Sequence, residues 1–179
     1  MVIDCIDMTD AGLGASRIAG LNAACVASTQ IQFYGESNGV TQMVSSVLSA
    51  ASAGTLDALR IWGHGYPGGQ NVTGGADGDT ADQDFAGMSG ANFNQTVGVL
   101  QQLKPLFSAS GRAELRGCSV GAGADGNVLL LDLASLWNVP VYGGDVVQFS
   151  ADWTPPVTCA SPSGACSTTS GPPLVEGNT

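Results

Sequence analysis

Basic residues are scarce in this sequence. Its 179 residues include 5 Lys and Arg against 15 Asp and Glu, which gives a formal net charge of −10. A field of that sign repels phosphate backbones, so the composition argues against a nucleic acid as partner. Charged residues make up only 11% of the chain and hydrophobic residues 44%, the balance of a globular protein rather than of a disordered chain.

Long apolar runs are also missing. No stretch approaches the roughly 18 consecutive apolar residues of a membrane-spanning helix, and the first residues, MVIDCIDMTD, have no basic segment ahead of an apolar one. The sequence therefore predicts neither a membrane span nor a cleaved secretory signal. We expect a cytoplasmic protein, or one exported by a route that does not read a cleaved N-terminal signal.

Histidine occurs once, at His64, and the five cysteines form no CxxC pair. A zinc site of Cys and His ligands is therefore not expected. Cys159 and Cys166 enclose a short loop of Ser, Pro and Gly. They could form a disulfide in an oxidising compartment or remain unpaired, and the sequence leaves both open. Because His64 is the one side chain that ordinarily titrates near neutral pH, any acid–base role in that range falls to it.

The length of the chain fits one domain with its own core. Apolar runs alternate with amphipathic stretches of helical length, which is typical of successive βα units. We assign residues 1–152 to this α/β domain and expect an irregular tail over residues 153–179, where Pro, Ser, Thr and Gly dominate. A loop from residue 66 to about residue 90 is unusually long, as functional or mobile loops are.

The pattern predicts a three-layer α/β/α sandwich with a mostly parallel central sheet. Ligands of such folds bind beyond the carboxyl ends of the strands. Two motifs, GHG and GCS, follow predicted strands at that edge of the sheet. The expected strands are 2–7, 30–36, 56–65, 113–118 and 139–144, and the expected helices are 14–28, 39–54, 92–110 and 126–138.

The stretch GCSVG, residues 117–121, contains two candidate nucleophiles. Ser119 fits the G-x-S-x-G elbow of α/β-hydrolases, but in that fold the histidine follows the serine, whereas His64 precedes it here. Cys118 ionises more readily than a serine hydroxyl and depends less on an adjacent base. We therefore expect Cys118 as nucleophile and His64 as acid and base. The alternative for each residue is structural: a small buried cysteine and a histidine in a turn.

The motifs LRIWGHG (59–65) and AELRGCSVG (113–121) resemble the strand ends that carry His-Gly and Cys in caspase-like, clan CD cysteine peptidases, including bacterial caspase-like domains. The resemblance spans roughly residues 1–150. It implies a caspase-like fold and a thiol protease, a hydrolase of protein or peptide substrates. In this family the cysteine, here Cys118, attacks the scissile carbonyl and the histidine, His64, protonates the leaving amine. The backbone N–H groups of Gly65 and Cys118 then hold the oxyanion.

Arg116 occupies the position two before the cysteine, which lines the S1 pocket in related peptidases. The resemblance thus implies that Arg116, with Asp145 as a second substrate-binding candidate, could select an acidic P1 residue, since a guanidinium pairs well with a carboxylate. Strand alternation places Glu114, Arg116 and Cys118 on one face of the sheet. An internal ion pair of Arg116 with Glu114 or Asp145 is therefore the alternative.

An acidic cluster lies in ADGDTADQD, residues 76–84. Its carboxylates could bind calcium, although the glycine and glutamate of an EF-hand are missing, and a solvated acidic loop is the alternative. No other cofactor or metal is expected. The carboxylates concerned are those of Asp77, Asp79, Asp82 and Asp84.

Two further hypotheses stand beside the peptidase. One is a catalytically silent caspase-like domain that acts as a binding or assembly module. The other is a serine esterase built on Ser119.

Overall fold

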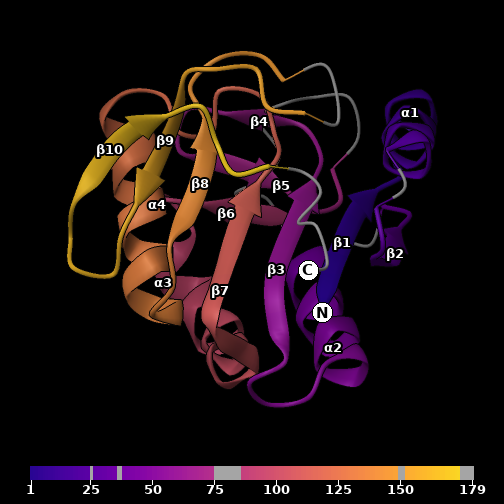
Figure 1. Cartoon of the computed structure of the whole chain (residues 1–179), viewed down its shortest axis with the longest axis horizontal. Helices are drawn as coiled ribbons and strands as arrows, with labels where there is room; N and C mark the ends of the chain where they lie inside the picture. Colours follow the sequence, from indigo (N-terminus) through magenta and orange to yellow (C-terminus); the bar gives the residue numbers. More distant parts are fainter. Residues whose placement is uncertain (25, 36–37, 75–85, 149–151, 174–179) are drawn as a thin grey trace.

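A computed structural model describes residues 1–24, 26–35, 38–74, 86–148 and 152–173 of the chain. These described residues form a seven-stranded sheet in the order β10-β9-β8-β7-β3-β1-β2 (Figure 1). The strands from β2 to β8 in that order are parallel, and β9 and β10 add an antiparallel hairpin at one edge. The strands are β1 (Val2–Asp7), β2 (Thr29–Phe33), β3 (Leu56–Trp62), β7 (Phe107–Leu115), β8 (Val141–Gly144), β9 (Val157–Ala160) and β10 (Cys166–Thr169).

Helices pack on both faces of this sheet. Apolar residues of α2 (Gly39–Ala50), α3 (Phe93–Leu100) and α4 (Gly123–Trp137) share one core cluster with alternate residues of the strands, such as Ile3 and Leu59. On the opposite face, α1 (Ala11–Ala23) packs its residues Leu21 and Ile18 against Ile6 and Trp62. The predicted three-layer α/β/α architecture with a mostly parallel central sheet is confirmed.

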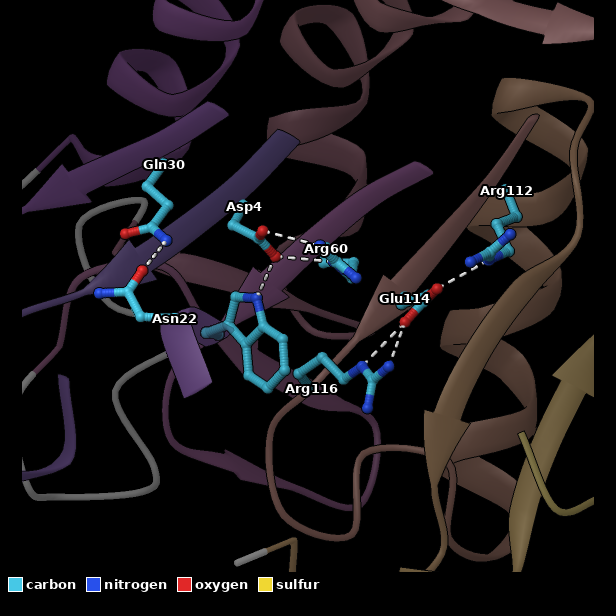
Figure 2. Close-up of polar contacts among 8 residues, drawn as sticks. Asp4, Asn22, Gln30, Arg60, Arg112, Glu114 and Arg116 are labelled. Carbon is cyan, nitrogen blue, oxygen red and sulfur yellow. Dashed lines mark hydrogen bonds and ion pairs between the residues drawn. The ribbon is translucent and has the colours of Figure 1, made fainter. Parts of the chain in front are cut away.

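The sheet face on the α1 side carries a row of buried charges. The parallel register places Asp4 beside Arg60 and Arg60 beside Glu114 on three adjacent strands. Arg60 donates to Asp4 through Nε at 2.7 Å and Nη2 at 2.8 Å, and the Trp62 indole N–H donates to the same carboxylate at 2.6 Å (Figure 2). Side chains two residues apart in a strand share a face. This alternation explains why the charged side chains lie on the α1 face of the sheet and the apolar residues of the main core lie on the other.

The segment after α3 differs from the sequence prediction. A helix was expected over residues 92–110, but α3 ends at Leu100, a 3₁₀ turn follows over Gln101–Leu106, and β7 begins at Phe107. Pro105 lies in that turn and has no N–H to continue a helical ladder. The strand that leads to Cys118 is therefore longer than expected and begins earlier.

The C-terminal residues also correct the prediction, since an irregular tail was expected from residue 153. Instead β9 pairs with β8 and β10 pairs with β9. Val157 and Ala160 are buried, so this short strand completes the core although its neighbourhood is rich in Pro, Ser and Gly.

Cys159 and Cys166 lie on this hairpin and both are free thiols. The register aligns Cys159 with Ser167 and Cys166 with Ala160. Neighbouring residues in a strand point to opposite faces, so the two sulfurs project from opposite sides of the hairpin and no disulfide forms.

The long loop after β3 contains a small antiparallel sheet. Its strands are β4 (Gly65–Tyr66), β5 (Gly69–Asn71) and β6 (Gly87–Ser89), in the order β4-β5-β6. The β4–β5 turn returns the chain at once toward the end of β3, because the Asn71 N–H donates to the His64 carbonyl at 2.9 Å. A hairpin thus begins directly at the histidine.

Candidate active site

The structure brings the two predicted catalytic segments into contact at the carboxyl edge of the sheet. His64 follows β3 and Cys118 follows β7, the neighbouring parallel strand. A methyl group placed on Gly65 would lie 3.0 Å from the Gly117 Cα and 3.0 Å from the Cys118 carbonyl oxygen. Only glycine allows two backbones to approach this closely, so the sequence GHG facing GC has a direct structural purpose.

The thiol of Cys118 is half-buried and lies against the loop after β8. The Gln148 N–H donates to Sγ at 3.4 Å, and the Gln148 carbonyl accepts a hydrogen bond from Arg17 Nη2 at 2.9 Å. Burial lowers the pKa of the Arg17 guanidinium, and its attraction to Cys118 acts in the opposite sense. An N–H donor and a nearby guanidinium are the surroundings in which nucleophilic thiolates are found.

The imidazole of His64 has a carboxylate partner that the sequence analysis did not identify. His64 Nε2 lies 3.4 Å from Asp10 Oδ2, and the ring is 26% exposed. Asp10 also caps α1, since its Oδ1 accepts from the Leu13 N–H at 3.1 Å. The Leu13 N–H and His64 together hold the pKa of the Asp10 carboxyl below its usual range. A thiol, an imidazole and a carboxylate thus lie on three neighbouring segments of the chain.

A second carboxylate lies at the end of β1. Asp7 accepts from the Thr9 N–H at 2.8 Å and from the Gly74 N–H at 3.1 Å. Burial raises the pKa of the Asp7 carboxyl, while these N–H groups and the charge of His64 act in the opposite sense. The histidine therefore lies in a negative field on the β1 side.

The chain bends sharply directly after Cys118. Ser119 has a φ of 57°, in the left-handed region that residues other than glycine seldom adopt. Its N–H donates to the Val146 carbonyl at 2.9 Å, and its own carbonyl accepts from the Ala122 N–H at 2.9 Å. Because α4 starts only at Gly123, the bend is a loop and not the immediate strand-to-helix elbow of the α/β-hydrolases.

The pairing of the β4–β5 hairpin leaves the Gly65 N–H unbonded to β5. Paired residues of antiparallel strands alternate between hydrogen-bonded and non-hydrogen-bonded positions. The bond from the Asn71 N–H to the His64 carbonyl makes the Gly65–Gln70 pair a non-hydrogen-bonded one. The Gly65 N–H therefore points away from β5.

Arg116 is only 1% exposed and is bound within the protein. Its Nε donates to Glu114 Oε2 at 2.8 Å, and Glu114 Oε1 accepts from Arg112 Nε at 2.7 Å (Figure 2). The guanidinium lies 4.9 Å from the ring centre of Trp62 and 3.9 Å from that of Trp153. Burial lowers the pKa of Arg116 to about 10, although Glu114 acts in the opposite sense. The internal ion pair considered as the alternative is present, with Glu114 as the partner.

Asp145, the other substrate-binding candidate, follows β8. Its N–H donates to the Pro156 carbonyl at 3.0 Å. Its Oδ1 is buried and, within the described part of the chain, accepts no hydrogen bond. A methyl group on Gly121 would lie 2.9 Å from that oxygen, so the carboxyl group faces the backbone of the bend after Cys118.

The calcium candidates Asp77, Asp79, Asp82 and Asp84 lie outside the described residues. Within the residues that are described, no three His, Cys, Asp or Glu side chains group closely enough to bind a metal ion. No helix among them is both long and apolar enough to cross a membrane.

A hollow of about 340 Å³ opens beside the site, one residue past Gly65. Apolar groups of Tyr66, Pro67 and Val128 line it, and Asp125 in the first turn of α4 contributes a carboxylate. The sequence analysis did not identify it, because its walls come from the β4–β5 hairpin, the residues after β6 and α4, which only the tertiary fold brings together.

The fold and this edge define an α/β sandwich protein with a thiol and an imidazole on adjoining parallel strand ends. The chain matches no protein-family model, no curated protein and no solved structure.

Proposed function

We propose that this protein is a caspase-like cysteine endopeptidase with Cys118 as nucleophile and His64 as acid and base. The observation that carries the proposal is the contact between the His64–Gly65 and Gly117–Cys118 segments at the carboxyl edge of the sheet. In a parallel α/β sheet this edge is where ligands bind.

The proposed reaction uses these two side chains and the adjacent backbone N–H groups. Cys118 gives its thiol proton to His64, and the thiolate attacks the scissile carbonyl carbon. The carbonyl oxygen then takes up negative charge beside the Gly65 and Cys118 N–H groups. The His64 imidazolium gives its proton to the leaving amine, and the acyl group remains on sulfur as a thioester. Water, deprotonated by His64, then attacks the thioester, and the thiol is regenerated with release of the new carboxyl group. Asp10 orients the imidazole through its contact with Nε2.

Selection of an acidic P1 side chain by Arg116 is the least supported part of the proposal. The guanidinium already has a carboxylate partner and lies between two indole rings. An acidic substrate side chain would have to displace Trp153 to reach it.

A catalytically silent binding module is the alternative, and activity separates it from the peptidase. The test uses the purified chain and a fluorogenic peptide library, with alkylation of each cysteine by iodoacetamide followed by mass spectrometry. We expect Cys118→Ala and His64→Ala each to lower kcat/KM by at least about 1,000-fold, while both variants stay folded.

Cys159→Ala is the matched control, because it removes a thiol from β9 and should leave the rate unchanged. If either Cys118→Ala or His64→Ala kept most of the rate, the assigned pair would be wrong. A folded wild-type chain without turnover, whose Cys118 alkylates no faster than a free thiol, would favour the silent module. Labelling of Ser119 by a fluorophosphonate would favour the esterase.

A further inference from the structure

Gln70, in β5, is completely buried, and its side-chain amide lies between the two catalytic segments. Its Oε1 accepts from the Gly117 N–H at 2.8 Å. Its Nε2 donates to the Asn71 carbonyl at 2.7 Å and lies 3.5 Å from the His64 carbonyl. One amide group therefore contacts the backbone next to the nucleophile and the backbone of the general acid.

We propose that Gln70 is a positioning residue that fixes the spacing between the Gly65 and Cys118 amides. This role rests on the proposed function, in which those two N–H groups receive the developing oxyanion. The anchor points are adjacent to them in sequence: His64 precedes Gly65, and Gly117 precedes Cys118. Any change in the Gln70 contacts therefore moves one amide relative to the other.

The position requires both halves of a carboxamide. The Gly117 N–H needs an acceptor, and the Asn71 carbonyl needs a donor. The His64 carbonyl already accepts from the Asn71 N–H and also lies 3.5 Å from the Gln70 amide nitrogen. A glutamate would keep the acceptor but place negative charge against two carbonyl oxygens. An apolar residue of the same size would leave the buried Gly117 N–H without its acceptor, which costs stability. Space is also fixed, since a methyl group on Gly117 would lie 2.8 Å from Oε1.

The sequence carries no signal for this role. Gln70 stands in YPGGQNVTGG, a stretch whose composition indicates only a loop. Its role depends on the tertiary fold, in which the β4–β5 hairpin places the Gln70 side chain against the residues that follow β3 and β7.

The test compares Gln70→Leu and Gln70→Glu with Asn92→Leu. Asn92 is a suitable control because its buried side-chain amide also bridges backbone groups, accepting from the Ser89 N–H at 2.9 Å and donating to the Gly87 carbonyl at 3.0 Å. Thermal unfolding establishes that each variant is folded at the assay temperature. The readouts are kcat and KM on the best library peptide, the rate of Cys118 alkylation, and hydrogen exchange at the Gly65 and Gly117 amides.

For both Gln70 variants we expect kcat to fall by about 10- to 100-fold with KM changed by less than about threefold. Alkylation of Cys118 should stay within about twofold of wild type, since attack on iodoacetamide needs the thiolate but no oxyanion site. Asn92→Leu should leave kcat within about twofold. Equal losses of kcat in Gln70→Leu and Asn92→Leu would overturn the role.

Hydrogen exchange separates this proposal from the proposed function. Exchange at the Gly117 amide should accelerate at least about tenfold in Gln70→Leu and stay unchanged in Asn92→Leu. Unchanged exchange in Gln70→Leu would overturn the positioning role whether or not the wild-type chain cleaves peptides. Accelerated exchange with an inactive wild type would keep Gln70 as the link between the two segments and reject the peptidase.

Discussion

At the residue scale, each reactive side chain has polar partners from a different part of the chain. The Cys118 sulfur faces the Gln148 N–H and Arg17, while His64 faces Asp10. The thiol and the imidazole therefore have separate polar partners.

Arg116 gives the first residue-scale prediction, because its pairing with Glu114 is buried. We expect Arg116→Gln to lower the free energy of unfolding by about 3 kcal/mol, since it removes one of the cations that neutralise a buried carboxylate. Glu114→Gln and the double variant complete a cycle, whose coupling free energy should be about 1–3 kcal/mol. Urea unfolding provides the measurement.

The same variant distinguishes structure from substrate recognition. A stability loss below about 0.5 kcal/mol, together with weaker cleavage after acidic residues, would assign Arg116 to the substrate instead. Unchanged P1 selectivity in a destabilised but folded variant would assign it to the core.

The sequence singled out the candidate nucleophile and base but not the polar groups around them. His64 and Cys118 stood out because each follows an apolar strand and lies beside glycine. Asp10 carried one usable signal, an N-cap residue just after the first strand. Gln148 and Gln70 carried none, because their roles depend on which backbone groups the tertiary fold places opposite them.

At the element scale, the close approach of two strand ends depends on glycine. A methyl group on Gly117 would lie 3.0 Å from both the Gly65 Cα and the His64 carbonyl oxygen, and backbone cannot yield as a flexible side chain can. We expect Gly117→Ala to lower the free energy of unfolding by about 1–3 kcal/mol and to reduce turnover, because the strand ends must separate.

Gly98→Ala is the matched control for this substitution. Gly98 lies within α3, and a methyl group there meets nothing within 4 Å. Alanine should therefore stabilise the helix by about 0.5–1 kcal/mol without affecting turnover. Thermal and urea unfolding of both variants tests the pair. Equal stability of Gly117→Ala and wild type would show that the ends of β3 and β7 can move apart to accommodate a methyl group at no cost in free energy.

Strong apolar periodicity explains which elements were predicted. The parallel strands up to β8 share one core cluster with α2, α3 and α4, and α1 packs a second, smaller cluster on the other face, so each element shows its buried face in the sequence. The β9–β10 hairpin was missed because an edge strand such as Cys166–Thr169, mostly exposed and rich in Ser and Thr, contributes little apolar signal. The helix expected up to residue 110 was too long because one proline interrupts an otherwise helical pattern.

At the scale of the whole molecule, the few basic side chains are mostly buried. The four arginines are at most 8% exposed, and Lys104 is the exposed basic side chain. The net charge of −10 is therefore not balanced by arginine side chains at the surface. Such a surface repels anionic partners and strains the folded state through its own repulsion.

This distribution predicts that salt stabilises the fold. Raising NaCl from about 20 mM to about 200 mM shortens the Debye length from roughly 20 Å to below 10 Å, which screens surface repulsion but leaves buried pairs such as Asp4–Arg60 almost untouched. We expect the free energy of unfolding to rise by about 1 kcal/mol over that range. Lys104→Gln removes the exposed cation and should make the salt dependence steeper. A fall in the free energy of unfolding with added NaCl would instead mean that attractive ion pairs at the surface, which salt screens, outweigh the repulsion between acidic side chains.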